Sequence, residues 1–585
     1  MRLVVLQNIP EEEKLRQEWN ALAKSMDRPQ VFFTFEWALA VQRAYGSTLH
    51  PLLFLAYENE QLIGVAALAD EGERISFLTA TTGDYCDFLG LPQHRAEFVN
   101  KVLDGLRRRG ARKITLTNLP ADSDSVSAIA AGARSSGFRH FARTAYICAQ
   151  VSFSRLEKAK DGMPTAPGQK RLRRLTKAVA GEGAVTFDHG RSWNTVAPVL
   201  PEFFQAHVGR FLEIGRISNN ANAHRRIFLE EVGKLMSASD WLVLSRMKVG
   251  GEPVAWHYGF QFEDNWFWYQ PTFDSRLEKH WPGFCLLTQV IQDAIRNPAI
   301  SRLDLGLGSE AYKAKFANDS RETLCVNLNR SWIDHWGTIF RYRLAEHVRT
   351  HPSLDSHIAS LRRAFRGLKS RQRSDGLKRT LRWIAWRLFS LLWKRDEVIF
   401  YEWESCRTQS LDRDDYEIRP LTLRELAMAT MEYSDEATQN YLLRSAKRLR
   451  EPFLRGFVLA RPEGCAVHFA WTAPLNGFQC AELNTTLQAP ESHLLLFDCW
   501  TPPVWRHRGY YGKAIRTIAG QLQESGKSPW IFSASNNAAS IQGILQAGFQ
   551  RRYSLVRKRL FGFEWIEGTA QTMKEDQYAQ LSAGI

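Results

Sequence analysis

The sequence has few cysteines for its length, and none of them are spaced for a metal or redox motif. Its 585 residues contain eight cysteines and no Cys-x-x-Cys pair, which argues against a zinc ribbon, a thioredoxin-like motif or a secreted disulfide scaffold. Glycine (38) and proline (22) are too few for a collagen-like or low-complexity chain. Hydrophobic residues make up 44%, which argues against a mainly disordered chain. We expect reduced, buried thiols and no metal site.

Long hydrophobic runs are also missing. No stretch of 18 or more uncharged apolar residues occurs, so we expect no membrane-spanning helix. The apolar start of the chain turns acidic at Glu11, Glu12 and Glu13, which is typical of a first strand and not of a signal peptide. We therefore expect a cytoplasmic protein, and leave open a peripheral position on the inner membrane.

The positive charge is concentrated in one segment. The chain has 77 Lys+Arg and 62 Asp+Glu, a net charge of +15. Residues 341–395 hold 15 basic and three acidic residues, so the rest of the chain is nearly neutral. Tryptophan, phenylalanine and leucine stand among the basic residues at 377–395, a pattern that favours a helix on an anionic membrane surface. A linker helix packed on the neighbouring domains is the open alternative. Nucleic acid is a disfavoured partner because no nucleic-acid motif accompanies the charge.

Strand-like and helix-like segments alternate on both sides of the basic segment, which predicts an α/β or α+β fold. The length predicts about three or four domains. We expect a first lobe at 1–150, a second lobe at 151–340, a basic amphipathic helical connector at 341–399, a C-terminal domain at 400–567 and a polar tail at 568–585. Hairpins are predicted at 51–68 and 241–260, and a helix from Pro282 to about Arg296.

The stretch most informative about chemistry lies in the C-terminal domain. It reads Arg506-His507-Arg508-Gly509-Tyr510-Tyr511-Gly512, follows a predicted strand and opens a predicted helix. Glycine lets the backbone approach a phosphate closely, and the free amides of a helix N-terminus point at the anion. Arginines beside such a turn add charge-assisted donors. The pattern therefore predicts a phosphate-binding turn.

This turn resembles the pyrophosphate loop of the GCN5-related N-acetyltransferase (GNAT) superfamily, through Arg506-x-x-Gly509-x-Tyr511. Asn537-Ala-Ala-Ser540, followed by Gly-Phe, is similar to the superfamily's Asn-x-x-Ser helix. The resemblance implies that residues 400–567 are a GNAT domain. It also implies that residues 506–512, Asn537 and Ser540 bind acetyl-CoA or another acyl-CoA.

The C-terminal domain departs from the superfamily at two positions. Tyr511 stands where the loop has a small residue, and Ile544 stands where many members carry a tyrosine general acid. Acyl transfer needs a positioned nucleophile, a base for its proton and donors for the developing oxyanion. Asp498 is either a catalytic group facing the cleft or a hydrogen-bonded structural aspartate. Tyr553 is a candidate proton donor.

A second resemblance covers residues 1–340 and is most specific at 253–316. Its motifs are Phe32-Phe-Thr-Phe-Glu-Trp37, Asp84-Tyr-Cys-Asp87, Ala255-Trp-His-Tyr-Gly259, Gln270-Pro-Thr-Phe-Asp274, Pro282-Gly283 and Asp304-Leu-Gly-Leu-Gly-Ser-Glu-Ala-Tyr-Lys313. They are similar to the acetyltransferase family associated with bacterial cellulose and exopolysaccharide biosynthesis, the CelD/BcsL type. This implies two fused GNAT-like lobes, an arrangement shared with Fem-type peptidoglycan aminoacyltransferases.

Four residues of the second lobe are candidate site residues. Asp304, at a strand end before two glycines, is placed to orient an acceptor amine or hydroxyl. Lys313, beside Tyr312, is either a compact positive charge for a phosphate or carboxylate, or a solvated helix lysine. We predict catalytic roles for Asp304 and Lys313, and substrate contacts for Tyr312 and His257. A satisfied core histidine is the alternative for His257, because it lies in an aromatic strand.

The leading hypothesis is an acyl-CoA-dependent N- or O-acyltransferase that acts on a bacterial surface polysaccharide or envelope precursor, with a sugar or amine as acceptor. The resemblance supplies the acceptor class. A Fem-like transferase that uses aminoacyl-tRNA is the runner-up, because the basic segment would attract RNA. A catalytically inactive, membrane-docked assembly factor is the non-enzymatic alternative.

Overall fold

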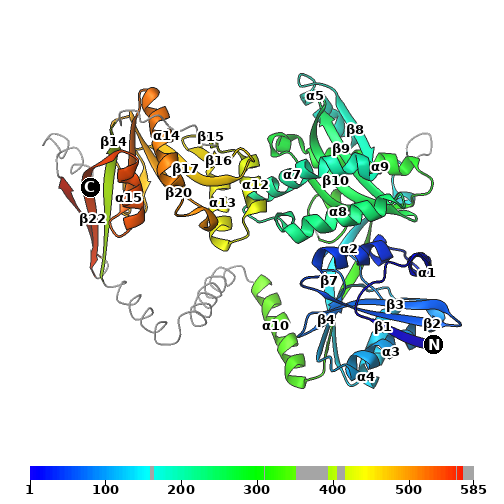
Figure 1. Ribbon diagram of the computed structural model, residues 1–585. Helices are drawn as coiled ribbons and strands as arrows, with labels where there is room; N and C mark the ends of the chain where they lie inside the picture. The colour runs from blue at the N-terminus through cyan, green and yellow to red at the C-terminus, as the bar shows by residue number, and fades with distance from the viewer. Residues whose placement is uncertain (159–163, 309, 351–392, 405–415, 561–562, 571–585) are drawn as a thin grey trace. The chain divides into compact units, whose positions relative to one another are not determined.

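The computed structural model describes residues 1–158, 164–308, 310–350, 393–404, 416–560 and 563–570 (Figure 1). The chain divides into two units, one of Met1–Arg210 and Asn219–Thr350, the other of Phe211–Ser218 and His351–Ile585. Both units mix helices with large sheets, as expected for an α/β fold. Most of the predicted connector, residues 351–392, lies outside the described residues. So does the polar tail from residue 571.

The first lobe alternates helices with short strands. Its elements are β1 (Arg2–Leu6), α1 (Glu13–Lys24), α2 (Phe35–Tyr45), β2 (His50–Glu58), β3 (Gln61–Asp70), β4 (Ile75–Phe77), β5 (Leu89–Gly90), α3 (Pro92–Arg108), β6 (Lys113–Pro120), α4 (Ser125–Ser135) and β7 (Arg139–Ser152). The predicted hairpin at 51–68 is confirmed as β2 and β3, joined by Asn59 and Glu60, which both have positive φ. Helices α3 and α4 pack on these strands and bury the core of this lobe.

The second lobe repeats this style and ends in a long helix. Its elements are α5 (Gln169–Ala178), β8 (Val185–Gly190), α6 (Trp193–Val196), α7 (Leu200–Glu213), α8 (Ala223–Ser237), β9 (Leu242–Val249), β10 (Glu252–Phe262), β11 (Asn265–Phe273), α9 (Pro282–Arg296), β12 (Arg302–Asp304), β13 (Asp319–Asn329) and α10 (Trp332–Thr350). The predicted hairpin of β9 and β10 and the predicted helix at Pro282 are both present. Helices α5 and α9 cover the core of this lobe.

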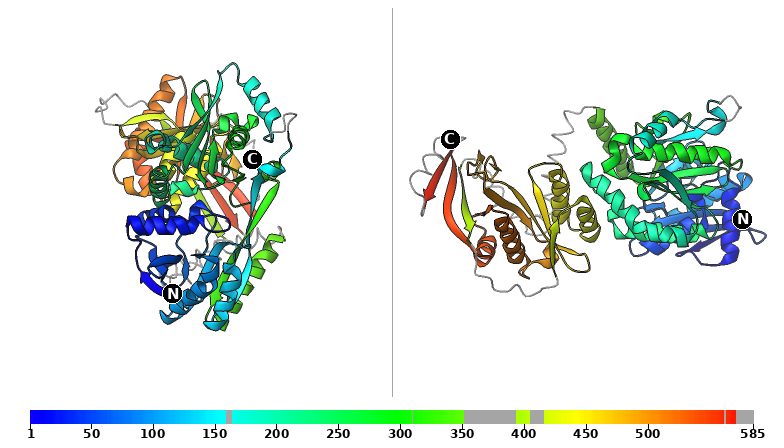
Figure 2. Two further views of the ribbon diagram at one scale, coloured as in Figure 1. Left: turned by 90° about the vertical axis from the view of Figure 1, so that its right-hand side faces the viewer. Right: turned by 90° about the horizontal axis from the view of Figure 1, so that it is seen from above.

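One continuous sheet runs through both lobes, in the order β1-β2-β3-β4-β6-β13-β7-β12-β11-β10-β9-β8, with β5 beside β3. Strand β13 comes near the end of the second lobe's segment of the chain but inserts between β6 and β7 of the first lobe, antiparallel to both. The far end of β7 pairs with β12, where Gln150 lies opposite Asp304. In Figure 2 the long strands β7 and β13 run side by side from one lobe to the other.

The second unit has its own mixed sheet. Its elements are β14 (Trp393–Trp403), β15 (Glu417–Pro420), α12 (Leu423–Glu432), α13 (Glu436–Arg448), β16 (Arg455–Ala460), β17 (Ala466–Pro474), β18 (Gln479–Cys480), β19 (Thr485–Thr486), β20 (His493–Trp500), α14 (Tyr510–Glu524), β21 (Ser528–Ala534), α15 (Ala538–Gln546), β22 (Phe549–Leu560) and β23 (Phe563–Ala570). Eight of these strands form one sheet, in the order β15-β16-β17-β20-β21-β14-β22-β23. Helices α14 and α15 cover one of its faces.

Strand β14 differs from the sequence expectation. Residues 393–399 were expected to continue the helical connector, but they form the first half of β14, between β21 and β22. Val398 and Phe400 point into the core on one sheet face, and Ile399 and Tyr401 into the core on the other. A strand buried on both faces reads as a continuous apolar run, which sequence periodicity does not separate from a helix.

Candidate functional site

The two lobes of the first unit meet at a group of buried polar side chains, with Asp84 at its centre. Asp84 lies in the loop between β4 and β5 and is partly exposed. Its carboxylate accepts the backbone N–H of Leu307 from the second lobe. A Cβ atom at Gly306 would lie 2.7 Å from Asp84 Oδ2, so glycine at this position lets the carboxylate come close to the loop after β12.

The surroundings of Asp84 favour its protonated form. Burial and the nearby charge of Asp304 raise the pKa of Asp84 to about 7, against the opposing effect of Lys313 and Arg225. A carboxyl group with a pKa near neutrality exchanges a proton readily at working pH, which suits a general base. Asp84 therefore has a pKa matched to proton transfer, and its residue as a whole is only partly covered.

Asp304 is buried next to Asp84 and is held by three hydrogen bonds. Its Oδ1 accepts the backbone N–H of Gly306 at 2.8 Å, and its Oδ2 accepts from Tyr85 Oη at 2.7 Å and from Gln150 Nε2 at 2.6 Å. Both carboxylate oxygens are thus occupied by groups of the protein. In this geometry Asp304 fixes the turn at Gly306 and places a negative charge next to Asp84.

Lys313 is also buried, with 4% of its surface exposed. Its Nζ donates to the carbonyl of Leu307 at 2.6 Å and forms an ion pair with Glu310 at 2.8 Å. The ammonium therefore holds the same loop whose amide bonds to Asp84. Tyr312 packs against the apolar core of the second lobe, and burial and the charge of Glu310 raise its pKa to about 12.

His257 has no exposed surface. Its ring stacks on Trp268 at 4.1 Å between centroids, and its Nε2 lies 3.1 Å from the carbonyl of Phe267. Burial lowers its pKa to about 3, so the ring is neutral at ordinary pH. His257 is therefore a core residue, as in the alternative considered from the sequence, but it is only partly satisfied, because its buried Nδ1 has no hydrogen-bond partner.

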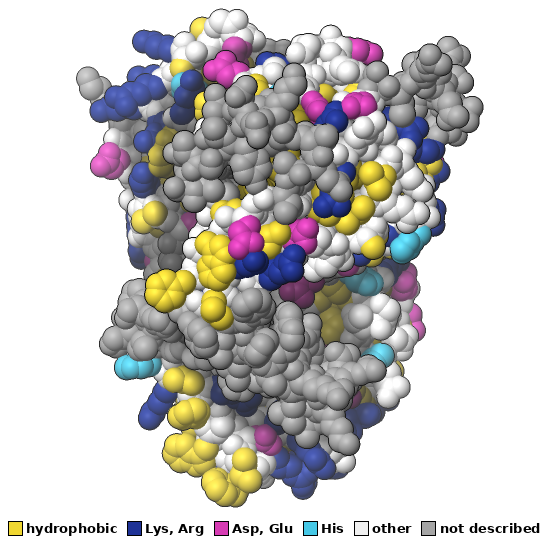
Figure 3. Space-filling view, turned by 90° about the vertical axis from the view of Figure 1, so that its left-hand side faces the viewer, with side chains coloured by type: hydrophobic (Ala, Val, Ile, Leu, Met, Phe, Trp, Pro, Cys, Tyr) yellow, Lys and Arg dark blue, Asp and Glu magenta, His cyan; other side chains and the backbone are white. Residues whose placement is uncertain are grey.

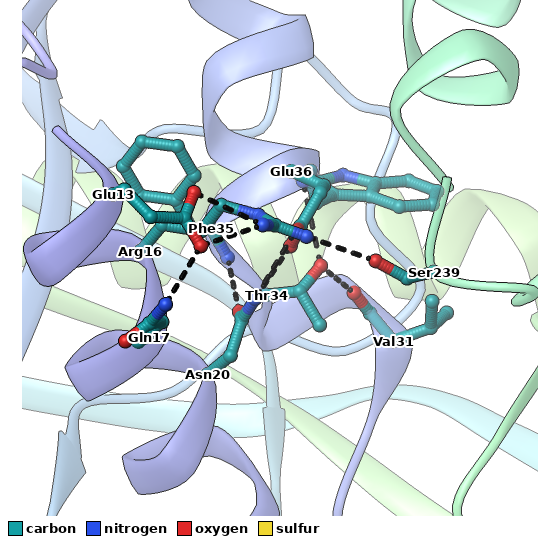
Figure 4. A network of polar contacts seen from close by, with 10 residues as sticks. Glu13, Arg16, Gln17, Asn20, Val31, Thr34, Phe35, Glu36 and Ser239 are labelled. Atoms are coloured by element: carbon teal, nitrogen blue, oxygen red, sulfur yellow. Dashed lines mark hydrogen bonds and ion pairs between the residues drawn. The ribbon is translucent and has the colours of Figure 1, made fainter. Parts of the chain in front are cut away.

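The motif at residues 32–37 joins the lobes (Figure 4). The carboxylate of Glu36 is buried and accepts from Arg16 Nε at 2.7 Å and from Asn20 Nδ2 at 2.9 Å. Arg16 also donates to Ser239 of the second lobe at 3.1 Å. Trp37 packs edge-on against Phe260 of the second lobe. We therefore assign these residues to packing between the two lobes and not to a chemical role in the site.

The C-terminal phosphate-loop motif forms the turn that its sequence predicts. Gly509 has a φ of 78° and directly precedes α14. Arg506, His507 and Arg508 are exposed on this turn, and no atom lies within 4 Å of the place of a Cβ at Gly509. Strands β20 and β21 pair in parallel only as far as Leu496 and Ile531, and each continues beyond that point. The motif thus forms an open cationic turn at the start of α14, and the strand that precedes it, β20, stops pairing with β21 beyond Leu496.

The remaining residues of the motif connect α14 to its neighbours. Tyr511 Oη lies 3.0 Å from Ser540 Oγ, and Asn537 caps α15 by accepting the Ser540 amide at 3.2 Å. The Tyr510 hydroxyl lies 2.9 Å from that of Tyr416. A Cβ at Gly512 would lie 3.7 Å from the carbonyl of Gly543. Tyr511 therefore fills the space between α14 and α15 that a small residue would leave open.

Asp498 and Tyr553 lie apart from one another in this unit. Asp498 has a positive φ within β20 and forms an ion pair with Arg448 of α13. Tyr553 stacks on Phe400 at 4.7 Å, on the sheet face opposite α14 and α15, and burial raises its pKa. The structure therefore does not bring these two residues together at one point beside the Gly509 turn. Their catalytic roles remain predictions.

The sequence analysis assigned no role to Asp84, Tyr85 or Gln150. Asp84 and Tyr85 stood inside a quoted motif, but nothing in the linear sequence links them to Asp304, which is more than 200 residues away. A second group was also missed, in which His189 lies 2.8 Å from Ser245 Oγ and 3.1 Å from Asp293. Because Ser245 is fully buried, this group fastens β8, β9 and α9 and offers no accessible nucleophile.

A comparison with protein families identifies the second lobe. Residues 168–314 match the family described as the acetyltransferase (GNAT) domain. The protein is an acyltransferase. The matched residues include β11, α9 and β12, and they end beside Lys313, so the Asp84–Asp304 site lies at the edge of the acetyltransferase domain. The narrower CelD/BcsL-type assignment remains a prediction.

Solved structures similar to the acyltransferase include FemX, with 11% identity, 56% of this chain and 97% of that chain covered, and a TM-score of 0.40. A tandem GNAT protein from the clavulanic acid biosynthesis pathway has 11% identity, coverage of 56% and 98%, and a TM-score of 0.35. A GNAT-family acetyltransferase from Colwellia psychrerythraea has 10% identity, coverage of 56% and 99%, and a TM-score of 0.30. No score reaches 0.5, so the substrate does not follow from these structures. A search of curated proteins finds no match.

Proposed function

We propose that the first unit transfers an acyl group from acyl-CoA to an amine or hydroxyl acceptor, with Asp84 as the base. The observation that carries this proposal is Asp84, a partly covered residue where the two lobes meet, whose carboxyl group has a pKa raised by burial to about 7. Acyl-CoA supplies the acyl group as an activated thioester. The acceptor's N–H or O–H proton passes to the Asp84 carboxylate as the new C–N or C–O bond forms, the thioester C–S bond breaks, and coenzyme A leaves as the thiolate, which then takes up a proton.

Backbone and side-chain geometry support this role. Strand β11 pairs in parallel with β12 only from Asn265 to Phe267, and from there to Phe273 it stays paired with β10 along its other edge. The backbone beyond Phe267 is therefore not engaged by β12 and is available to an extended ligand. Asp304 and Lys313 hold the Gly306–Leu307 turn beside it. We assign both as positioning residues for Asp84.

The acceptor is a sugar or amine of a bacterial surface polysaccharide or envelope precursor. This part of the proposal rests on the similarity of residues 253–316 to the CelD/BcsL-type family.

The second unit is proposed as a further acyl-CoA-binding domain. The residues present suit a pyrophosphate, because the turn at Gly509 has open space above it and exposed Arg506 and Arg508 beside it. His507, Tyr510, Tyr511, Gly512, Asn537 and Ser540 would complete the cradle. The buried Ile544 offers no proton at the position of the superfamily's tyrosine, so binding is the better supported role of this unit.

The test has two measurements. Calorimetry measures the binding of acetyl-CoA, and the release of free thiol from acetyl-CoA in the presence of glucosamine or a cello-oligosaccharide measures turnover. Gly306→Ala places a methyl group 2.7 Å from Asp84 Oδ2 and is expected to lower turnover, whereas Gly72→Ala has the same left-handed φ with no atom within 4 Å. Gly509→Trp is expected to abolish acetyl-CoA binding by the second unit. Its control, Gly526→Trp, lies just beyond the other end of α14 and is expected to retain that binding.

Four outcomes would contradict the proposal. Equal turnover in Gly306→Ala and Gly72→Ala would remove the Asp84 site, and absence of acetyl-CoA binding by the wild type would remove the acyl-CoA assignment. Turnover that requires aminoacyl-tRNA and continues without acetyl-CoA would establish the Fem-like alternative. Binding with no turnover on any acceptor would favour an inactive assembly factor.

A further inference from the structure

Helix α10 is attached to the first unit by one face only. Tyr342 packs on Phe141 of β7 at 5.8 Å between ring centroids, and the Arg143 guanidinium lies 4.8 Å from the Tyr342 ring. Asp334 forms an ion pair with Lys113 of β6 at 2.9 Å. These contacts fix the rotation of the helix about its own axis, and so they determine which side chains point away from the sheet.

The outward face of α10 is apolar. Its exposed apolar residues are Trp332 (61%), Ile333 (66%), Trp336 (59%), Phe340 (67%) and Leu344 (45%), and the second half of the helix also exposes Arg341, Arg343, Glu346 and His347. Because 332, 336, 340 and 344 are four residues apart, they form one stripe along the helix. Figure 3 shows hydrophobic side chains gathered at the lower end of that view, on the side of the first unit that carries α10 in Figure 1. A surface helix normally turns polar side chains outward, and a continuous apolar stripe marks an interaction site.

Most of the exposed charge around this stripe is positive, although Glu346 of α10 is also exposed. Arg341 and Arg343 are exposed on α10, and Arg139 and Arg330 are exposed near its start, where Arg139 donates to the Arg330 carbonyl at 2.9 Å. The chain that follows, residues 351–392, contains ten basic and two acidic residues. Tryptophan and phenylalanine on a helix flanked by arginine suit the boundary between acyl chains and anionic headgroups.

We propose that the outward stripe of α10 lies in the surface of an anionic lipid membrane, with the helix parallel to the plane of the bilayer. The described part of the chain contains no helix that is both long and apolar enough to span a bilayer, which agrees with a position at the surface. A protein partner would need an acidic apolar groove. An anionic lipid surface offers both negatively charged headgroups and an apolar acyl-chain region, so it needs no such groove. This inference is independent of the proposed catalytic activity.

The test is flotation of the full chain with phosphatidylcholine vesicles that contain about one-third phosphatidylglycerol. The variant W332S/W336S/F340S is expected to lower the bound fraction at least about tenfold. Its control, F453S/V504S/F563S, removes equally exposed apolar side chains of the second unit and is expected to bind like the wild type. The variant R341E/R343E is expected to lose binding to anionic vesicles by about tenfold or more.

Equal flotation of the wild type and W332S/W336S/F340S would overturn the proposal, as would equal binding of the wild type to vesicles without phosphatidylglycerol. Light scattering of the lipid-free protein provides the competing outcome. A dimer that W332S/W336S/F340S abolishes, together with no vesicle binding, would assign the stripe to a second copy of this chain. Melting curves of each variant show that the fold is retained, and R341E/R343E tests the proposal without any change to the apolar stripe.

Discussion

Asp84 is a carboxyl group whose surroundings oppose its ionisation. In the unfolded chain its pKa is close to the ordinary value of 3.8, and in the folded protein it is about 7. Between these values the folded state holds the proton more tightly than the unfolded state does. The contribution of Asp84 to stability therefore falls as the pH rises from about 4 to about 7, and the charged form that catalysis needs is the form that destabilises the fold.

Replacement of Asp84 by asparagine should separate these two effects. Wild-type kcat/KM is expected to rise with pH through about 7, and Asp84→Asn should lose about 10²–10⁴-fold and this pH dependence. The same variant should melt at a higher temperature than the wild type at pH 8, and the difference should shrink towards pH 5. Asp27→Asn, an exposed aspartate, is the control. An acid limb that persists in Asp84→Asn would contradict the role.

At the residue scale, the sequence predicted the second-lobe half of the site but not the first-lobe half. Asp304 and Lys313 could be named because they flank two glycines in one short motif. Asp84 could not be assigned, since its pKa depends on burial between lobes and on a charge distant in the sequence. For His257 the local sequence was ambiguous. A polar residue in an aromatic strand has the same sequence pattern whether its side chain faces a cleft or the core.

Among the elements, the stability of α2 depends on its N-cap residue, Thr34. Thr34 Oγ1 accepts the Trp37 amide at 3.4 Å as the N-cap of α2 and donates to the Val31 carbonyl at 2.7 Å. Thr34→Ala is expected to lower the free energy of unfolding by about 1 kcal/mol. Thr48→Ala, at an exposed turn beyond the other end of the helix, should lower it less. Denaturant titration of both variants measures this difference. An equal loss would show that the cap does not stabilise the helix.

The elements that the sequence predicted best are those with local signals. The turn at Asn59 and Glu60 and the proline at the start of α9 define their elements through adjacent residues. Strand β14 and the outward face of α10 had no such signal. Tryptophan and arginine in close succession are compatible with a strand, a packed helix or an interfacial helix, and tertiary pairing decides among them.

On the scale of the whole molecule, β13 makes the first lobe depend on a strand near the end of the second lobe's segment. A fragment of residues 1–152 lacks β13 and leaves β6 and β7 unpaired along the positions that β13 fills. It is expected to give no cooperative melting transition by circular dichroism, whereas residues 1–350 should melt cooperatively. A cooperative transition of the shorter fragment would show that β13 is dispensable.

The strand order of the large sheet was not predictable from the sequence. Alternating strands and helices indicate an α/β class, but they do not specify that the strand at 319–329 pairs with those at 113–120 and 139–152. Such pairings involve residues far apart in the chain, and they are selected by the packing of both lobes together.

The position of β13 also sets the timing of folding during synthesis. Residues 139–152 leave the ribosome well before residues 319–329, which complete their sheet. At about 5–20 residues per second, the delay is on the order of 10–30 s. For that time the nascent chain carries an open sheet with two unpaired strands. The second lobe is therefore made while the first still needs protection from aggregation, for which binding of a chaperone to the nascent chain is the natural means.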